Sequence, residues 1–127
     1  MQEQETRSSG KVDILVVGGS PRRNGRTQSI SRYAEQRLSA AGFAVKRIEL
    51  AELGLPVYDG SFGQAALPSV AAWKDAARSA DGFFIATPDY HNGMSGALKN
   101  ALDLLGGDDF RRKPAAIAAM SGGGKGG

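Results

Sequence analysis

The chain has 127 residues, 41% of them hydrophobic, and a formal net charge of +3 at pH 7. This length predicts a single domain, and this hydrophobic content excludes a chain that stays disordered. The sequence has no cysteine and one histidine, His91, which excludes disulfides and thiolate metal sites and argues against a histidine-based metal site.

The distribution of charged and apolar residues along the chain indicates where in the cell the protein is located and which classes of partner it can bind. The polar opening, residues 1–11, predicts a flexible leader and has no apolar core of a signal peptide. No apolar run approaches the roughly 20 residues that cross a bilayer, so we expect no membrane partner. The lack of cysteine suits a reducing cytoplasm, which is the location we expect. Because arginines cluster in one loop rather than along a face, a nucleic-acid partner is disfavoured.

The first predicted elements are a strand, a helix and a second strand. The β-branched run KVDILVVG, residues 11–18, is typical of a buried parallel strand and ends in glycine. Thr27 is expected to cap a helix that Gly42 ends. Apolar positions with helical spacing support it: Ile30, Tyr33, Ala34, Leu38 and Ala41. AVKRIEL, residues 44–50, predicts a second strand whose polar composition suits a sheet edge.

The second half continues the alternation after an irregular stretch, residues 51–67, that is rich in glycine. Residues 68–79 predict a helix with Val70, Trp73 and Ala77 on one stripe. GFFIAT, residues 82–87, predicts the most hydrophobic strand, and a turn and a helix over 95–105 follow it. KPAAIAAMS, residues 113–121, predicts a fourth strand.

Strands that alternate with helices of this length predict right-handed crossovers and a parallel sheet. In such a sheet, ligands bind beyond the carboxyl ends of the strands. Three loops leave these ends, at residues 19–27, 88–95 and 121–127, and they are rich in Gly, Asn, Ser and Arg. We therefore expect one ligand to contact all three loops.

The first loop, within VVGGSPRRNGRT (residues 16–27), carries Arg22, Arg23 and Arg26. A GxGxxG fingerprint is absent, and a Walker-type loop fits only in part, because Ser20 replaces its first glycine and Arg26 its lysine. Binding a single terminal phosphate requires fewer features than these nucleotide-binding motifs. N–H groups at a helix start, the hydroxyls of Ser20 and Thr27, and a guanidinium are sufficient. The alternative is a basic loop that faces water, but the position between a buried strand and a helix favours phosphate.

The second loop, TPDYHNG, contains Pro88, which fixes φ, and the pair Asn92-Gly93, which readily takes positive φ. Such a turn can lay peptide groups along the edge of a planar heterocycle, with Tyr90 packed nearby. The alternative makes Tyr90 a core aromatic and His91 a surface residue. The third loop, SGGGKGG, either lets a flat ring approach its backbone or forms a tail.

Together these segments resemble a known family. GGSPRRNGRT after the first strand, PDYHNGMSGALKNALDLL after the third and SGGGKGG after the fourth are similar to motifs of the NADPH-dependent FMN reductase family, in particular its bacterial azoreductases. The resemblance covers residues 12–127. Asp89 stands where the family usually has glutamate, which keeps the acidic character.

The resemblance implies a flavodoxin-like, doubly wound α/β fold with the strand order 2-1-3-4-5, and an FMN-binding domain over residues 12–127. It implies an enzyme in which non-covalent FMN takes hydride from NADPH or NADH and passes electrons to a quinone, azo compound, flavin or metal oxyanion, with no catalytic side chain. It also implies a homodimer or homotetramer. The residues implied to hold the FMN phosphate are Ser20, Arg22, Arg26, Thr27 and Gln28. Those implied to line the isoalloxazine ring are Pro88, Asp89, Tyr90, His91, Asn92 and Gly93 at one edge and Ser121, Gly122, Gly123 and Gly124 at the other.

The family fold continues with a fifth strand and a last helix, whereas this sequence ends at Gly127. We expect an open edge on the fourth strand and one sheet face without its helix, as in a portion of a longer chain. Two other functions stay open. A flavodoxin-type electron carrier is disfavoured by the basic phosphate loop, and a flavin-free structural relative would be colourless when purified.

Overall fold

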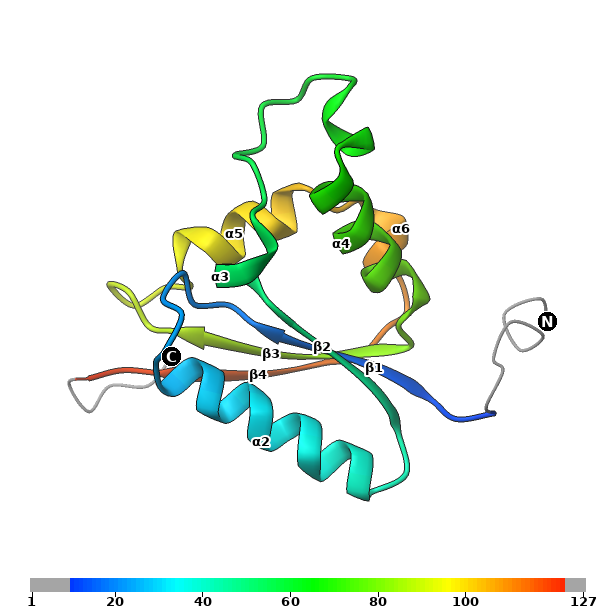
Figure 1. Cartoon of the computed structure of the whole chain (residues 1–127), viewed down its shortest axis with the longest axis vertical. Helices are drawn as coiled ribbons and strands as arrows, with labels where there is room; N and C mark the ends of the chain where they lie inside the picture. Colours follow the sequence, from blue (N-terminus) through cyan, green and yellow to red (C-terminus); the bar gives the residue numbers. More distant parts are fainter. Residues whose placement is uncertain (1–9, 123–127) are drawn as a thin grey trace.

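The computed structural model describes residues 10–122, which form a parallel sheet with helices on both faces (Figure 1). The strands are β1 (Asp13–Gly18), β2 (Ala44–Glu49), β3 (Gly82–Pro88) and β4 (Ala115–Met120). They are hydrogen-bonded in the order β2-β1-β3-β4, and each neighbouring pair is parallel. The predicted strand order is therefore confirmed as far as the fourth strand. Most of the predicted leader, residues 1–9, lies outside the described residues.

The helices cover the two faces unequally (Figure 1). One face carries α2 (Arg26–Ala40), and the other carries α3 (Leu50–Leu53), α4 (Pro68–Ser79), α5 (Gly96–Asp103) and α6 (Gly107–Phe110). The short helices α3 and α6, and a 3₁₀ turn at Gln64–Ala66, lie where no element was predicted. Each is about one turn long, which is too short to show a hydrophobic period. None of the helices among residues 10–122 is long and apolar enough to cross a bilayer.

The main core lies between the sheet and α4 and α5. Val70, Trp73 and Ala77 are each at most 1% exposed, so the predicted stripe of α4 is confirmed. They pack in one cluster with strand residues such as Leu15 and Ile85. The indole N–H of Trp73 donates to a backbone carbonyl of α5 at 2.8 Å, so its one polar atom is buried with a partner.

The predicted orientation of α2 is wrong in part. The helix begins at Arg26 with Gly25 as its N-cap, so Thr27 does not cap it. Tyr33 is 59% exposed and Ala41 is also exposed, although both were predicted on the buried stripe. The buried residues of α2 are Thr27, Gln28, Ser31 and Ala34, because polar contacts to β2 turn this face towards the sheet.

The strand β4 is the edge of the sheet among the described residues. Its residue Ile117 is 70% exposed, and Ala115 and Ala116, which precede it, are exposed too. In Figure 1, α2 lies on one side of the sheet, and the other helices gather on the other side. Within residues 10–122, the expected open edge with exposed apolar surface is therefore present.

A buried carboxylate fixes α6 onto α4. Asp109 is 1% exposed, and its Oδ2 accepts the Gly106 N–H at 2.8 Å and the Lys74 ammonium at 3.2 Å. The guanidinium Nε of Arg78 lies 3.5 Å from its Oδ1. Burial alone would raise the pKa of Asp109, but these donors and charges outweigh burial and lower it below its ordinary value.

The lowered pKa of Asp109 predicts an acid-sensitive contribution to stability. A carboxyl whose pKa is lower in the folded state stabilises the fold fully above its unfolded pKa, about 3.9, and loses this contribution as the pH falls through the folded value. We expect Asp109→Asn to lower the free energy of unfolding by about 1–3 kcal/mol at pH 7, and the difference to shrink below about pH 4. Urea unfolding at several pH values measures it.

Asp108→Asn is the matched control for this experiment, because the Asp108 side chain is 85% exposed on the same helix. Its effect should stay within about 0.5 kcal/mol at every pH. A difference for Asp109→Asn that is the same at pH 7 and below about pH 3 would contradict the ionic role of Asp109.

Candidate functional site

The loops that follow β1, β3 and β4 lie at the same, carboxyl edge of the sheet (Figure 1). Residues from all three loops line one cleft there. Its volume is about 120 Å³, which is below the roughly 300 Å³ of sites that enclose a whole small-molecule ligand. The cleft is therefore large enough for one end of such a ligand only. Its walls are formed by Ser20, Arg22, Gly25, Arg26, Thr27, Pro88, Asp89, Tyr90, Met120 and Gly122.

The start of α2 forms the part of the cleft that can bind an anion. Ser29 N–H donates to the Gly25 carbonyl at 3.3 Å, so the preceding N–H groups of Arg26, Thr27 and Gln28 have no helical acceptor. The first turn holds no acidic residue, and Gly25 has no side chain that could cap it. These N–H groups, the positive end of the helix dipole and the Arg26 guanidinium together attract an anion.

Two hydroxyl groups and two arginines complete this end of the cleft. Ser20 and Thr27 are 3% and 4% exposed, and the Ser20 Oγ accepts the Arg22 N–H at 3.0 Å. Arg22 and Arg26 are exposed. Burial fixes the hydroxyl groups, whereas the long arginine side chains are free to adjust to a ligand. Arg23, on the same loop, does not line the cleft.

The third loop approaches α2 through Gly122. A Cβ atom placed on Gly122 would lie 3.5 Å from Nη2 of Arg26, so the loop backbone and this guanidinium are neighbours. Ser121, next to it, is half-buried. Gly123 and Gly124, which the resemblance assigns to the same edge of the ring, lie outside the described residues.

The second loop is a tight two-residue hairpin. Tyr90 and Gly93 exchange backbone hydrogen bonds of 3.0 and 3.1 Å, and His91 and Asn92 between them have φ of 56° and 64°. The predicted positive φ thus falls one residue earlier than Asn92-Gly93, because a hairpin of this kind needs it at both central residues. Pro88, Asp89 and Tyr90 reach the cleft, whereas His91, Asn92 and Gly93 form the exposed tip beyond its wall.

Tyr90 and Asp89 both line the cleft but differ in their exposure. Tyr90 is 41% exposed, so the alternative of a core aromatic is wrong. The Asp89 N–H donates to the Met120 carbonyl at 2.6 Å, which joins the second loop to β4. Its Oδ1 is buried and has no hydrogen-bond partner among residues 10–122. Because buried carboxylate oxygens are normally paired, a donor on a ligand would complete this one.

Ser95, to which the sequence assigned no role beyond the start of a helix, joins the first and second loops. Its Oγ accepts the Leu98 N–H at 3.0 Å, which caps α5, and donates to the Gly19 carbonyl next to the cleft. Its N–H donates to the Thr87 Oγ1 at 3.2 Å. Ser95 is 0% exposed, so these bonds are shielded from water. The sequence signal was only a serine before a helix, which indicates a cap but not its tertiary partner.

This arrangement is suited to hold a terminal phosphate and the polar chain attached to it. The phosphate would accept from the helix N–H groups, the two hydroxyls and the arginines. In the part of the chain that the structure describes, no cluster of three or more His, Cys, Asp and Glu side chains is placed to hold a metal ion. Gln28 is the one residue of the implied phosphate set that does not line the cleft.

Comparison with known structures supports the same fold. The apo form of an NADH:FMN oxidoreductase matches with a TM-score of 0.76 and 27% identity, over 89% of this chain and 60% of that chain. FerB, an NAD(P)H:(acceptor) oxidoreductase from Paracoccus denitrificans, matches with a TM-score of 0.65 and 28% identity, over 86% of this chain and 60% of that chain. The expected flavodoxin-like fold is therefore confirmed for the part that this chain contains.

Comparison with known sequences gives the family. An NADPH azoreductase of Bacillus sp. (strain OY1-2) is 42% identical over 116 residues, which are 91% of this chain and 62% of the relative. An FMN-dependent NADPH-azoreductase of Staphylococcus saprophyticus is 34% identical over 113 residues, which are 86% and 60%. The chain thus spans about three fifths of the length of these relatives. A sequence model described as NADPH-dependent FMN reductase matches residues 12–127, and the chain belongs to this family.

Proposed function

We propose that residues 12–127 are the FMN-binding part of an NADPH-dependent oxidoreductase and that the cleft holds the FMN phosphate. One observation carries this proposal: the loops after three strands meet at a cleft that combines an open helix start, two buried hydroxyls and two arginines. The names of the relatives, FMN-dependent NADPH-azoreductase and NADH:FMN oxidoreductase, support the same cofactor and the same class of electron donor.

The residues present fit this cofactor. The volume of the cleft suits one end of FMN, and the unpaired Oδ1 of Asp89 is an acceptor for a hydroxyl or N–H group of the cofactor. Tyr90 offers its exposed ring as a packing surface, and Gly122 keeps the third loop free of a side chain. When bound, FMN would accept the hydride of NADPH and pass the electrons on. The protein therefore has to orient the ring, and no side-chain acid or base is needed.

The electron acceptor follows only from the relatives. We propose an azo compound or a quinone as the acceptor, with free flavins and metal oxyanions as further members of the same reactive class. NADPH is the proposed donor because both azoreductases are named for it, and NADH is the alternative because the oxidoreductase of known structure is named for NADH. A cytoplasmic location is proposed from the absence of cysteine.

Self-association is proposed from an exposed apolar loop. Val57 and Phe62 are 80% and 107% exposed, although hydrogen bonds fix the loop that carries them. The Asn100 amide donates to the Pro56 carbonyl at 2.9 Å, and the buried Gln64 donates to the Val57 carbonyl at 2.7 Å. An ordered loop that exposes large apolar side chains is typical of a protein interface, and a second copy of the chain is the proposed partner. We expect the molecular mass in solution to be that of a dimer or larger oligomer, and a monomer mass would contradict self-association.

The proposed function is tested by the colour of the protein. After purification with added FMN, we expect flavin absorbance that bleaches when NADPH is added without oxygen and returns when an azo dye or a quinone is added. Protein that binds FMN but does not react with NADPH would be an electron carrier of the flavodoxin type. Protein that shows no flavin band and no affinity for FMN in a titration would be the flavin-free relative, and either result would overturn the proposal.

A further inference from the structure

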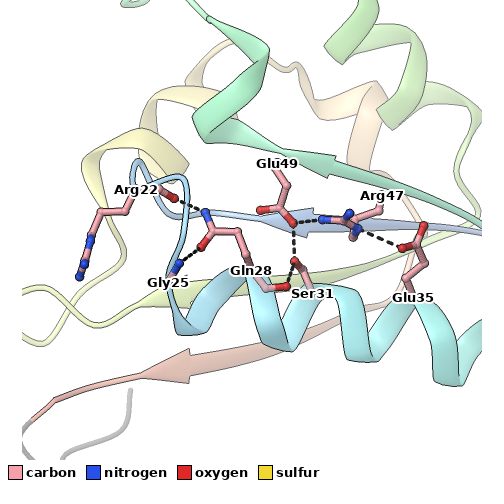
Figure 2. Close-up of polar contacts among 7 residues, drawn as sticks. All are labelled: Arg22, Gly25, Gln28, Ser31, Glu35, Arg47 and Glu49. Carbon is pink, nitrogen blue, oxygen red and sulfur yellow. Dashed lines mark hydrogen bonds and ion pairs between the residues drawn. The ribbon is translucent and has the colours of Figure 1, made fainter.

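The Gln28 side-chain amide bonds at both its oxygen and its nitrogen to the loop that precedes α2 (Figure 2). Its Oε1 accepts the Gly25 N–H at 2.9 Å, and its Nε2 donates to the Arg22 carbonyl. The side chain is 1% exposed and does not line the cleft, so it is turned away from the place proposed for the phosphate. The resemblance implied a direct contact between Gln28 and the phosphate, and the structure gives this side chain other partners.

These bonds close the loop on itself. Gln28 joins Arg22 to Gly25, and the Arg22 N–H in turn donates to the Ser20 Oγ at 3.0 Å. One buried side chain therefore fixes the backbone position of Arg22, whose guanidinium lines the cleft, and of Gly25, the N-cap of α2. Arg22 and its neighbours up to Asn24 are exposed, so without Gln28 the backbone of this loop has water as its main alternative partner.

A buried network fixes the helix face from which Gln28 projects (Figure 2). Ser31, one turn further along α2, is 0% exposed, and its Oγ lies 3.0 Å from the Gln28 carbonyl and within hydrogen-bond distance of Glu49 Oε2. The hydroxyl has one proton, and the carboxylate is the stronger acceptor. Arg47 donates to Glu49 and, at 3.0 Å, to Glu35. The end of β2 thus prevents α2 from rotating.

The close approach of Glu49 to β1 leaves this network little freedom. A Cβ atom placed on Gly18, its register partner, would lie 1.9 Å from Glu49 Oε1. Glu49 is 7% exposed, and Oε1 has no hydrogen-bond partner within the described part of the chain. The carboxylate is therefore confined between the backbone of β1 and Ser31 of α2.

We propose that Gln28 is a positioning residue, whose side chain holds residues 20–25 in their anion-binding shape before any ligand arrives and does not itself bind the phosphate. The proposal deepens the proposed function, because the phosphate in question is that of FMN. A loop that is already ordered in the free protein avoids the entropy cost of ordering on binding, which raises the affinity without a new contact.

The first test uses the protein without FMN. Gln28→Ala removes the acceptor of the Gly25 N–H, so amide hydrogen exchange of Gly25, followed by NMR, should become about three- to tenfold faster. Gln28→Glu keeps a carboxylate oxygen as acceptor for this N–H but loses the donor to the Arg22 carbonyl, so its Gly25 exchange rate should lie between those of the unaltered protein and Gln28→Ala. Gln36→Ala, an exposed glutamine on the same helix, is the matched control and should leave the Gly25 exchange rate unchanged.

The second test compares FMN with riboflavin, which lacks the phosphate. Gln28→Ala should weaken FMN binding by about three- to tenfold and change riboflavin binding much less. A Gly25 exchange rate unchanged in Gln28→Ala, together with weaker FMN binding, would assign Gln28 a direct phosphate contact and overturn the positioning role. Faster exchange with unchanged FMN affinity would overturn its link to the cofactor. If the unaltered protein binds neither flavin, the proposed function fails, and the exchange result still reports on the loop.

Discussion

Replacing Arg22 with alanine is expected to weaken FMN binding by about 1.5–3 kcal/mol, the range of a hydrogen bond to a charged group. Arg22 lines the cleft beside the open start of α2, where a phosphate would lie. Its guanidinium can form two parallel bonds to phosphate oxygens, which a lysine cannot, so Arg22→Lys should recover only part of the loss. A fluorescence titration with FMN gives the dissociation constants.

Arg23→Ala separates a specific contact from the general charge of the loop. Arg23 carries the same charge on the neighbouring residue, but it does not line the cleft. Its removal should cost only the screened long-range attraction between exposed charges, about 0–1 kcal/mol, and this cost should vanish at high salt. Equal losses for the two alanine variants would show that no direct contact with Arg22 exists.

Replacing Ser95 with alanine is expected to lower the free energy of unfolding by about 2–4 kcal/mol, since it removes a helix cap and leaves a buried carbonyl unpaired. The Leu98 N–H and the Gly19 carbonyl both lose their partner at a site with 0% exposure. Trp73, the single tryptophan and 1% exposed, reports unfolding by fluorescence in urea. FMN binding should weaken as well, because Gly19 precedes Ser20 in the cleft.

Ser29→Ala is the matched control for the Ser95 experiment. Ser29 is exposed on α2, and the same substitution there should change stability by no more than about 0.5 kcal/mol. A loss below this value for Ser95→Ala would show that water or a neighbouring group satisfies Gly19, and that the two loops are not held together by this side chain.

The joint between these loops also explains why residue 19 is glycine. The Gly19 N–H donates to the Ala86 carbonyl at 2.7 Å, and a Cβ atom on Gly19 would lie 2.7 Å from that same oxygen. Because this oxygen belongs to the backbone of β3, no side chain could move aside to make room for a Cβ atom. The backbone at the end of β1 therefore lies against β3, which brings the first and second loops to one cleft.

The sequence by itself determined the elements whose pattern is local. The apolar runs of β1 and β3, the stripe of α4 and the alternation of strands and helices depend on neighbours within a few residues, so they could be predicted without a fold. The parallel order then followed from the handedness of the crossovers and the resemblance. The meeting of three loops at one edge was predictable for the same reason, because parallel strands end on the same side.

The tertiary structure decided which side chains face the cleft. Gln28 turns into the loop and not towards the cleft because Ser31 and Glu49, 18 residues apart, fix the rotation of α2. The bond from Ser95 to Gly19 spans 76 residues, and no local pattern can encode such a partner. Composition and spacing thus predicted the edge of the sheet at which the cleft lies, whereas contacts between distant residues determined which side chains line the cleft and which hold those residues in place.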